Sequence, residues 1–329
     1  MTSILGHLMS MNTPYSRSLR LLLCGLALLS QCARREFAYH RFLVGGPCSV
    51  TFDITNLGLA SHLYNEIDNA LVRYDSLLSY FSQKSLVSEI NTRHRVKLEP
   101  EIVGLFHLCD SVSRLTGGCF DISIAPLMKI WGFYEGNYTV PDSALVRRTR
   151  ELVDFRRILL RNDSIFTPED MQIDLGGIAQ GWVADRIADL LKGYGVRQAV
   201  IDIGGEVVCV GRSPMGRPWR VGIRHPRREG VIETLDIADG AVSTSGDYEK
   251  YFIVGDRRYP HIIDPLTGEP ARDFVSVTII DRDAAFCDGL ATAVCVMGVE
   301  AGVKFLDSLH IRGILYHEVD GRLERVETP

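Results

Sequence analysis

The segment IDLGGIAQGW, residues 173–182, joins an aspartate and a glycine pair to the start of a helical pattern. Apolar residues recur at helical spacing from about Ile178 to Gly193, and we expect Asp174 to end a strand. Two interpretations are open. The glycines can simply permit unusual backbone angles in a tight turn. Alternatively, bare backbone at a helix N-terminus can approach a phosphate-bearing ligand. The segment is not GxGxxG, so it does not predict a dinucleotide-binding Rossmann fold.

The length and composition of the chain limit the classes of protein to which it can belong. The chain has 329 residues, 46% of them hydrophobic, and a net charge of -5. This is enough for a large core in one or two domains. No dense basic patch is present, so we expect no nucleic-acid partner. The eight cysteines form no CxxC pair, which argues against a zinc ribbon or a thioredoxin-type motif.

The N-terminus has the pattern of an export signal. Arg17 and Arg20 precede the apolar run LLLCGLALLS, residues 21–30, which is short for a membrane span. A buried strand or helix is the alternative. Cys32 stands where a bacterial lipoprotein carries its lipid, although Gln31 before it is bulkier than usual. We therefore predict a leader over residues 1–32 and one domain over residues 33–329.

The rest of the chain mixes helices and strands. Helical spacing predicts helices over residues 57–78 and 100–115, another near Ser143, and one beginning at Cys287. β-branched and alternating stretches predict strands in both halves, among them residues 40–54, 198–211 and 276–283. We expect an α/β or α+β fold with mixed, largely antiparallel sheets flanked by helices.

The segment CDGLATAV, residues 287–294, places Asp288 and Thr292 four residues apart, on one face of a helix. A carboxylate and a hydroxyl are hard oxygen ligands that suit magnesium. An N-capping aspartate and a helical threonine bonded to its own backbone are the alternative, and it is the commoner case.

Two further segments carry polar groups. In VSTSGDYEKYF, residues 242–252, a small polar turn around Thr244 can bond phosphate oxygens or a ring edge. In YPHIIDPLTGEP, residues 259–270, His261 opens a tight turn. A lone histidine is usually structural, but one beside other polar loops is a candidate for a site.

Taken together, the motifs resemble the ApbE-type family of FAD:protein FMN transferases. The resemblance covers nearly all of the chain from about residue 40. The segments that carry it are YDSLLSYFSQKSLVSEIN, TGGCFDISIAPLMKIWGF, IDLGGIAQGW, IDIGGEV, VSTSGDYEKYF, HIIDPLTGEP and CDGLATAVCVMG. It implies a transferase with a cleft for FAD and Mg²⁺.

The resemblance also implies site residues. Asp288, Thr292 and the carbonyl of Gly177 match metal ligands, and His261 and Asp288 are the implied catalytic residues. Tyr80 is similar to an aromatic residue that lies against the flavin ring. The implied FAD-binding set is Tyr80, Ala125, Pro126, Leu127, Asp174, Gln180, Thr244, His261, Ile262 and Ile263.

Three positions depart from the pattern of the family. Gln180 replaces a lysine or glutamate, VGGPC at residues 44–48 replaces a Met-Gly-Thr motif, and Ala285 replaces an acid of some members.

The implied reaction moves FMN from FAD to a threonine or serine hydroxyl of a target protein and releases AMP. The implied acceptor is a membrane redox subunit, and the implied location is the periplasmic face of the bacterial inner membrane, with a lipid anchor at Cys32. Two alternatives remain open at this point. One is an FAD pyrophosphatase that forms FMN and AMP, and the other is a flavin-binding lipoprotein without chemistry.

Overall fold

A computed structural model describes residues 35–329. The predicted leader over residues 1–32 lies outside the described residues. The fold is built on an eight-stranded sheet in the order β1-β2-β6-β7-β10-β13-β14-β15, in which every neighbouring pair is antiparallel. These strands are β1 (Arg35–Leu43), β2 (Gly46–Ile54), β6 (Ala199–Ile203), β7 (Glu206–Val210), β10 (Gly240–Gly246), β13 (Ser276–Asp281), β14 (Arg312–Val319) and β15 (Arg322–Glu327). This confirms the predicted α/β class with antiparallel pairing.

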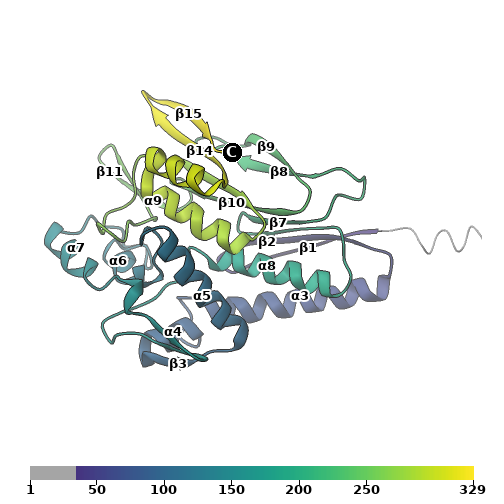
Figure 1. The fold of residues 1–329 in the computed structure, drawn as a ribbon, viewed down its shortest axis with the longest axis horizontal. Helices are drawn as coiled ribbons and strands as arrows, with labels where there is room; N and C mark the ends of the chain where they lie inside the picture. The colour runs from purple at the N-terminus through teal and green to yellow at the C-terminus, as the bar shows by residue number, and fades with distance from the viewer. Residues whose placement is uncertain (1–34) are drawn as a thin grey trace, which may run out of the picture.

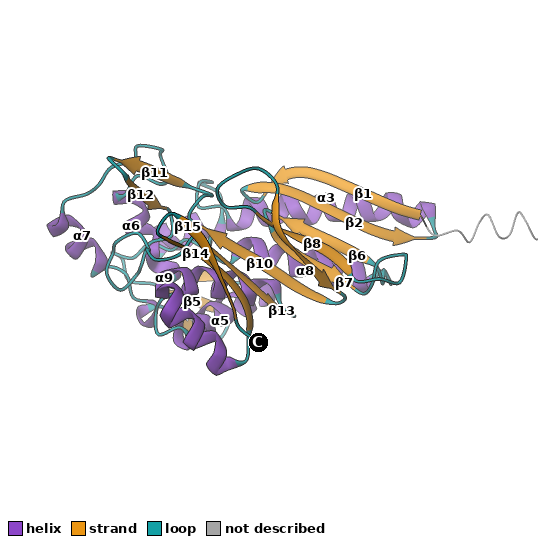
Figure 2. Ribbon diagram, turned by 90° about the horizontal axis from the view of Figure 1, so that it is seen from above, coloured by secondary structure: helices purple, strands orange, loops and turns teal. Residues whose placement is uncertain are grey.

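Helices cover one face of this sheet (Figure 1, Figure 2). The helix α8 packs on β6 and β7, and α9 packs on β10, β13 and β14, while α3 and α5 pack on α8 and α9 respectively. The predicted helices over 57–78 and 100–115 are confirmed, because apolar side chains at helical spacing face the sheet and its helices. The four helices are α3 (Leu57–Leu78), α5 (Pro100–Leu115), α8 (Ala179–Gly193) and α9 (Ala284–Leu309).

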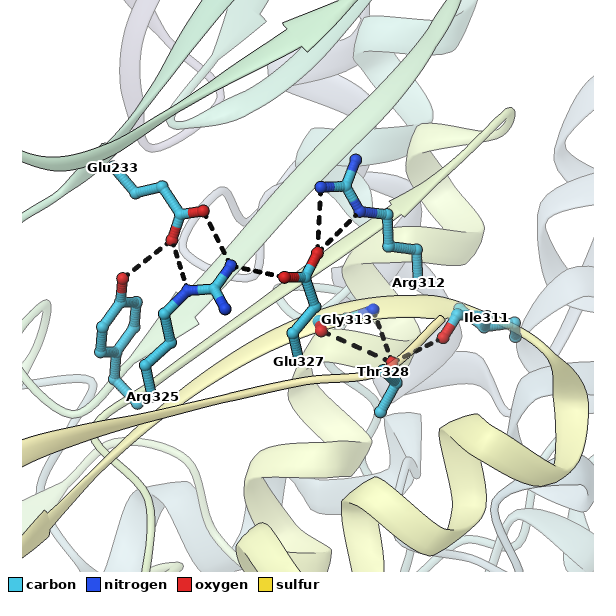
Figure 3. A network of polar contacts seen from close by, with 8 residues as sticks. Glu233, Ile311, Arg312, Gly313, Arg325, Glu327 and Thr328 are labelled. Carbon is cyan, nitrogen blue, oxygen red and sulfur yellow. Dashed lines mark hydrogen bonds and ion pairs between the residues drawn. The ribbon is translucent and has the colours of Figure 1, made fainter.

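A two-stranded ribbon, β8 (Trp219–Arg224) and β9 (Val231–Ile237), packs its apolar side chains on the large sheet through a second, smaller core. Polar contacts tie the ribbon to the C-terminal hairpin (Figure 3). The Arg325 guanidinium donates to both carboxylate oxygens of Glu233 at 2.8 Å, and the Tyr316 hydroxyl donates to the same carboxylate at 2.9 Å. A bidentate pair fixes the angle of approach as well as the distance. The network therefore holds the ribbon against β14 and β15.

The remaining elements surround the helical side. A second hairpin, β11 and β12, stands apart from the large sheet, and a third core of aromatic and aliphatic residues lies beneath it. The elements are α4 (Leu86–Arg93), β3 (Arg95–Lys97), η1 (Ile122–Ile124), α6 (Ala125–Ile130), α7 (Ser143–Arg150), η2 (Phe155–Arg157), β4 (Leu159–Arg161), β5 (Ser164–Phe166), β11 (Tyr251–Val254) and β12 (Arg257–Pro260).

Two local predictions are wrong. Residues 172–175 form an irregular segment and not a strand, because Asp174 donates its backbone N–H to the Ile122 carbonyl in a loop instead of entering a ladder. Residues 243–246, expected as a polar turn, lie inside β10 and pair with β13. Short polar residues are typical of a turn, yet here pairing with β13 satisfies backbone groups of this segment.

Candidate active site

The three glycines of residues 173–182 take no positive φ angle, so the interpretation of an unusual backbone conformation is wrong at these positions. Their role is close approach. A Cβ atom at Gly181 would lie 2.3 Å from the Ala284 carbonyl oxygen, where α8 crosses the start of α9. A Cβ atom at Gly177 would lie 3.3 Å from Thr292 Oγ1. The absence of side chains lets the loop before α8 touch α9 directly.

The contact between α8 and α9 brings the predicted metal ligands together. The side chain of Thr292 faces Gly177, and Asp288 lies one helical turn earlier on α9, 5% exposed. The Asp288 carboxylate accepts a hydrogen bond at Oδ2 from the Gly181 N–H at 3.1 Å. The carboxylate and the hydroxyl of α9 thus meet two glycines, Gly181 and Gly177, of a segment that lies more than a hundred residues earlier in the sequence.

The capping alternative for Asp288 is excluded by geometry. The N-cap of α9 is Asp283, whose side chain accepts from the Phe286 N–H. The Ala284 and Ala285 N–H groups donate at 3.0 Å and 2.9 Å to Asp185, a carboxylate that α8 supplies. Three of the free N–H groups of the helix terminus are therefore satisfied without Asp288.

Burial sets the charge state of Asp288. Loss of solvent raises its pKa to about 7, and the carboxylates of Glu249 and Asp185 add to the rise, while the hydrogen bond from Gly181 opposes it. A carboxylate that is costly to ionise in a dry site gains most from a nearby cation. The donor set suits Mg²⁺, since hard oxygens bind it and the ion keeps positions for phosphate oxygens and water. Among the described residues, no group of three or more histidine, cysteine or acidic side chains forms an all-protein metal cage.

The predicted ring-binding residue Tyr80 follows α3 and is half-buried. Its ring stacks on Tyr134 with a centroid distance of 3.8 Å and an interplanar angle of 19°. The Tyr134 hydroxyl donates to Asp174 Oδ2 at 2.7 Å, and the Gly176 N–H donates to Asp174 Oδ1 at 2.8 Å. Burial raises the pKa of Asp174, and these two hydrogen bonds and the nearby Lys250 oppose the rise. The structure thus connects an aromatic pair to the glycine loop through one carboxylate.

His261 lies at the base of the hairpin formed by β11 and β12. Its Nδ1 is 3.2 Å from the carbonyl oxygen of Lys250. The residue is half-buried, and desolvation of the ring, with the positive charge of Lys250, lowers its pKa to about 4. A carbonyl only accepts, so the contact requires the proton of the neutral ring on Nδ1, which leaves Nε2 with a free lone pair.

The other predicted FAD-binding residues are either buried apolar residues or polar residues whose side chains bond to other parts of the protein. Ala125, Pro126 and Leu127 are buried at the start of α6, and Ile262 and Ile263 are buried in two different cores. Gln180 turns away to the hairpin between β1 and β2, where its Nε2 donates to the Val44 carbonyl at 2.9 Å. Thr244 lies in β10, and its hydroxyl pairs with Thr278 at 2.9 Å.

Sequence reasoning missed several residues that the fold brings to this region. They are Tyr134, Asp185, Glu206, Glu249 and Lys250. Glu206 follows the glycine pair of IDIGGEV, and Glu249 and Lys250 are part of VSTSGDYEKYF, so each lies in or beside a motif already singled out. No local signal marks Asp185, because its partners are backbone groups of a distant helix.

The fold, and the order in which the site motifs occupy it, are those of the flavin transferases. A solved structure from Pseudomonas stutzeri, described as the flavinyl transferase ApbE in its apo form, superposes with a TM-score of 0.81 at 27% identity. The match covers 90% of this chain and 95% of that one. A sequence model of the ApbE family matches residues 44–315, and the chain belongs to this family.

Two relatives support the same assignment. A Vibrio cholerae protein named FAD:protein FMN transferase is 31% identical over 314 residues, which cover 91% of this chain and 93% of that protein. A Klebsiella pneumoniae protein of the same name is 32% identical over 281 residues, which cover 83% and 86%. The predicted family and the prediction of a transferase enzyme are confirmed.

Proposed function

We propose that the protein transfers FMN from FAD to a threonine or serine hydroxyl of a target protein, with release of AMP, in a reaction that depends on Mg²⁺. The observation that carries this proposal is the meeting of Gly177, Thr292 and Asp288 across the contact between α8 and α9. The part of the proposal that concerns flavin transfer to a protein is supported by the names of the relatives. The part that concerns Mg²⁺ is supported by the oxygen atoms of Asp288 and Thr292, because Mg²⁺ prefers hard oxygen ligands.

In this proposal Asp288, Thr292 and the Gly177 carbonyl would hold the cation. When bound, Mg²⁺ neutralises the diphosphate and stabilises the charge that grows on the leaving phosphate. Lys250 lies near both Asp174 and His261 and places a further positive charge at this side of the site. The protein's part is positioning and electrostatics, and no side chain of the enzyme becomes covalently modified.

His261 is the proposed base. The Nε2 lone pair of its neutral ring accepts the proton of the acceptor hydroxyl as oxygen attacks the phosphorus of the FMN half. The bond between that phosphorus and the bridging oxygen breaks, and the electron pair leaves with AMP. Asp288 was the other candidate for the base. Its hydrogen bond from Gly181 and its place beside Thr292 favour a role in holding the cation instead.

The experiment incubates the full chain with FAD, a peptide that contains an acceptor threonine, and either Mg²⁺ or a chelator. Covalent flavin fluorescence on the peptide, lost with chelator, is the expected result. Free FMN and AMP without labelled peptide would identify a pyrophosphatase instead, and flavin bound without any product would identify a binding protein.

Substitution of the proposed cation ligand sharpens this test. We expect Asp288→Ala to abolish turnover and its dependence on metal, while FAD binding weakens less. Asp307→Ala is the matched control, because Asp307 is an exposed acid on the same helix. Unchanged turnover in the Asp288 variant would contradict the assignment.

We also propose that the chain is exported, that its lipid is attached at Cys32, and that its acceptor is a membrane redox subunit. The basic flank and apolar run of residues 17–30 support export. Incorporation of labelled palmitate into the wild-type chain, and its loss in Cys32→Ser, is the expected result. Equal labelling of both chains would contradict attachment at Cys32.

A further inference from the structure

Glu206 is a buried acid that the proposed mechanism does not use. It opens β7 directly after the turn at Gly204 and Gly205, and it is 5% exposed. Its Oε2 atom makes no hydrogen bond with any residue in the described part of the chain. A buried carboxylate oxygen without a donor is costly, because nothing replaces the water it has lost.

The surroundings of Glu206 contain further unused oxygens. The register of β7 and β10 pairs Val207 with Val242, which places Ser243 opposite Glu206, and α9, which carries Asp288, packs on both strands. Ser243 is fully buried, and its Oγ atom also lacks a hydrogen bond of good geometry within residues 35–329. Asp288 uses Oδ2 for the Gly181 N–H, so Oδ1 remains free of the hydrogen bonds that the described residues make.

Three elements, β7, β10 and α9, thus direct carboxylate and hydroxyl oxygens at one region. Two buried acids near each other repel when both are ionised, so they either keep a proton or need a positive charge between or beside them. No lysine or arginine forms an ion pair with Glu206 or Asp288 in the described part of the chain. A hard divalent cation would bind the unsatisfied oxygens and would also neutralise the repulsion between the two carboxylates.

We propose that Glu206 and Ser243 are additional oxygen donors to the divalent-cation site, approaching Asp288 from the side of the sheet. Ligation is direct or through a water of the cation. This inference rests on the cation of the proposed function, and it extends the donor set beyond Gly177, Asp288 and Thr292. The ligand class is a hard divalent cation, Mg²⁺ or Mn²⁺.

The experiment measures Mn²⁺ binding by calorimetry and by electron paramagnetic resonance in the full chain without FAD. Variants are Glu206→Gln, Glu206→Asp and Ser243→Ala, and Glu300→Gln is the control because Glu300 is an exposed acid on α9 paired with Lys304. We expect the Kd for Mn²⁺ to rise at least tenfold in Glu206→Gln, about threefold in Ser243→Ala, and not in the control.

A second readout separates ligation from a structural role. In chelator, at a pH at which both acids are ionised, Glu206→Gln should melt at a higher temperature than the wild type, because repulsion from Asp288 is gone. Added Mn²⁺ should then raise its melting temperature less than that of the wild type.

Wild-type affinity for Mn²⁺ in folded Glu206→Gln would overturn this inference and leave the proposed function intact. A variant that melts lower in chelator and binds Mn²⁺ normally would overturn it in the same way. Should Glu206→Gln fail to fold, Glu206→Asp and Ser243→Ala decide, and unaltered affinity in both overturns the inference. Absence of Mn²⁺ binding by the folded wild type would overturn this inference and the proposed cation together.

Discussion

The Gly181 N–H donates to Asp288 Oδ2 at 3.1 Å, across a contact at which a Cβ atom on Gly181 would lie 2.3 Å from the Ala284 carbonyl oxygen. One glycine therefore does two things at the same place. It lets α8 approach the start of α9, and it orients the carboxylate that the proposed cation requires. Stability and site geometry are coupled through this position.

The substitution Gly181→Ala should reduce both the stability of the fold and the affinity of the site for a cation. The added methyl group forces the two helices apart, and we expect a loss of about 1–3 kcal/mol in the free energy of unfolding, since overpacking shifts backbone. Chemical denaturation of the variant measures it. The affinity for Mn²⁺ should fall as well, because the shifted backbone moves the N–H that orients Asp288. Gly193→Ala is the control, since Gly193 ends α8 and a Cβ atom there meets nothing within 4 Å. Equal stability of the two variants would contradict the close contact.

Removal of the Tyr134 hydroxyl should disturb the glycine loop without removing the aromatic stack. In Tyr134→Phe the ring still faces Tyr80, but Asp174 loses a hydrogen bond of 2.7 Å. We expect a loss of about 1–3 kcal/mol in unfolding free energy, and a KM for FAD several-fold higher with a smaller change in kcat. Tyr138→Phe tests the specificity of this effect, because Tyr138 lies in the same loop and stacks on Phe252 instead. A similar KM change in both variants would argue against the role of Asp174.

The stability of the metal-free protein should depend on the protonation of Asp288. Its pKa is about 7 in the folded protein and about 3.9 in an unfolded chain, so the folded state holds a proton that the unfolded state has released. This contribution to stability is complete below pH 4 and is lost as pH rises through 7. It amounts to at most about 4 kcal/mol, at 1.36 kcal/mol per pKa unit.

The measurement is denaturation in chelator at pH 4 to 8 for the wild type and Asp288→Asn. Asp185, whose pKa is also raised to about 7 by burial, contributes with the same sign to both proteins. The difference between the two curves therefore reports the titration of Asp288 together with its electrostatic coupling to Asp185 and Glu249. Parallel curves would show that Asp288 ionises normally, and saturating Mg²⁺ should diminish the difference because the cation favours the carboxylate.

His261→Gln should lower kcat about 10²- to 10⁴-fold, with a much smaller loss of FAD affinity, because it removes the proposed base. The pKa of about 4 predicts a neutral ring throughout the working range. The wild-type profile of kcat/KM should therefore show no inflection near pH 6.5. An inflection there that disappears in His261→Gln would place the pKa of this ring near its ordinary value.

Much of the fold could be predicted from the sequence. The helices α3 and α5 match the predicted ranges because their apolar residues recur at the helical period, and that pattern is local. The hairpin of β6 and β7 follows from two β-branched stretches on either side of a glycine pair, whereas the pairing of β13 with β14 does not, because the whole of α9 separates these strands. The predicted strand before Asp174 is wrong because an apolar run of that length does not distinguish a strand from a buried loop.

The order of the motifs determined the family, and the four-residue spacing of Asp288 and Thr292 determined that both lie on one helix face. Only the tertiary structure decided what the glycines of residues 173–182 are for, that Asp185 caps a helix it does not belong to, and that the strand of Glu206 packs against the helix of Asp288. The physical reason is the distance along the chain over which each effect acts. Helix periodicity acts over a few residues, whereas the exclusion of a Cβ atom or the repulsion between two buried carboxylates exists only once segments a hundred residues apart have packed together.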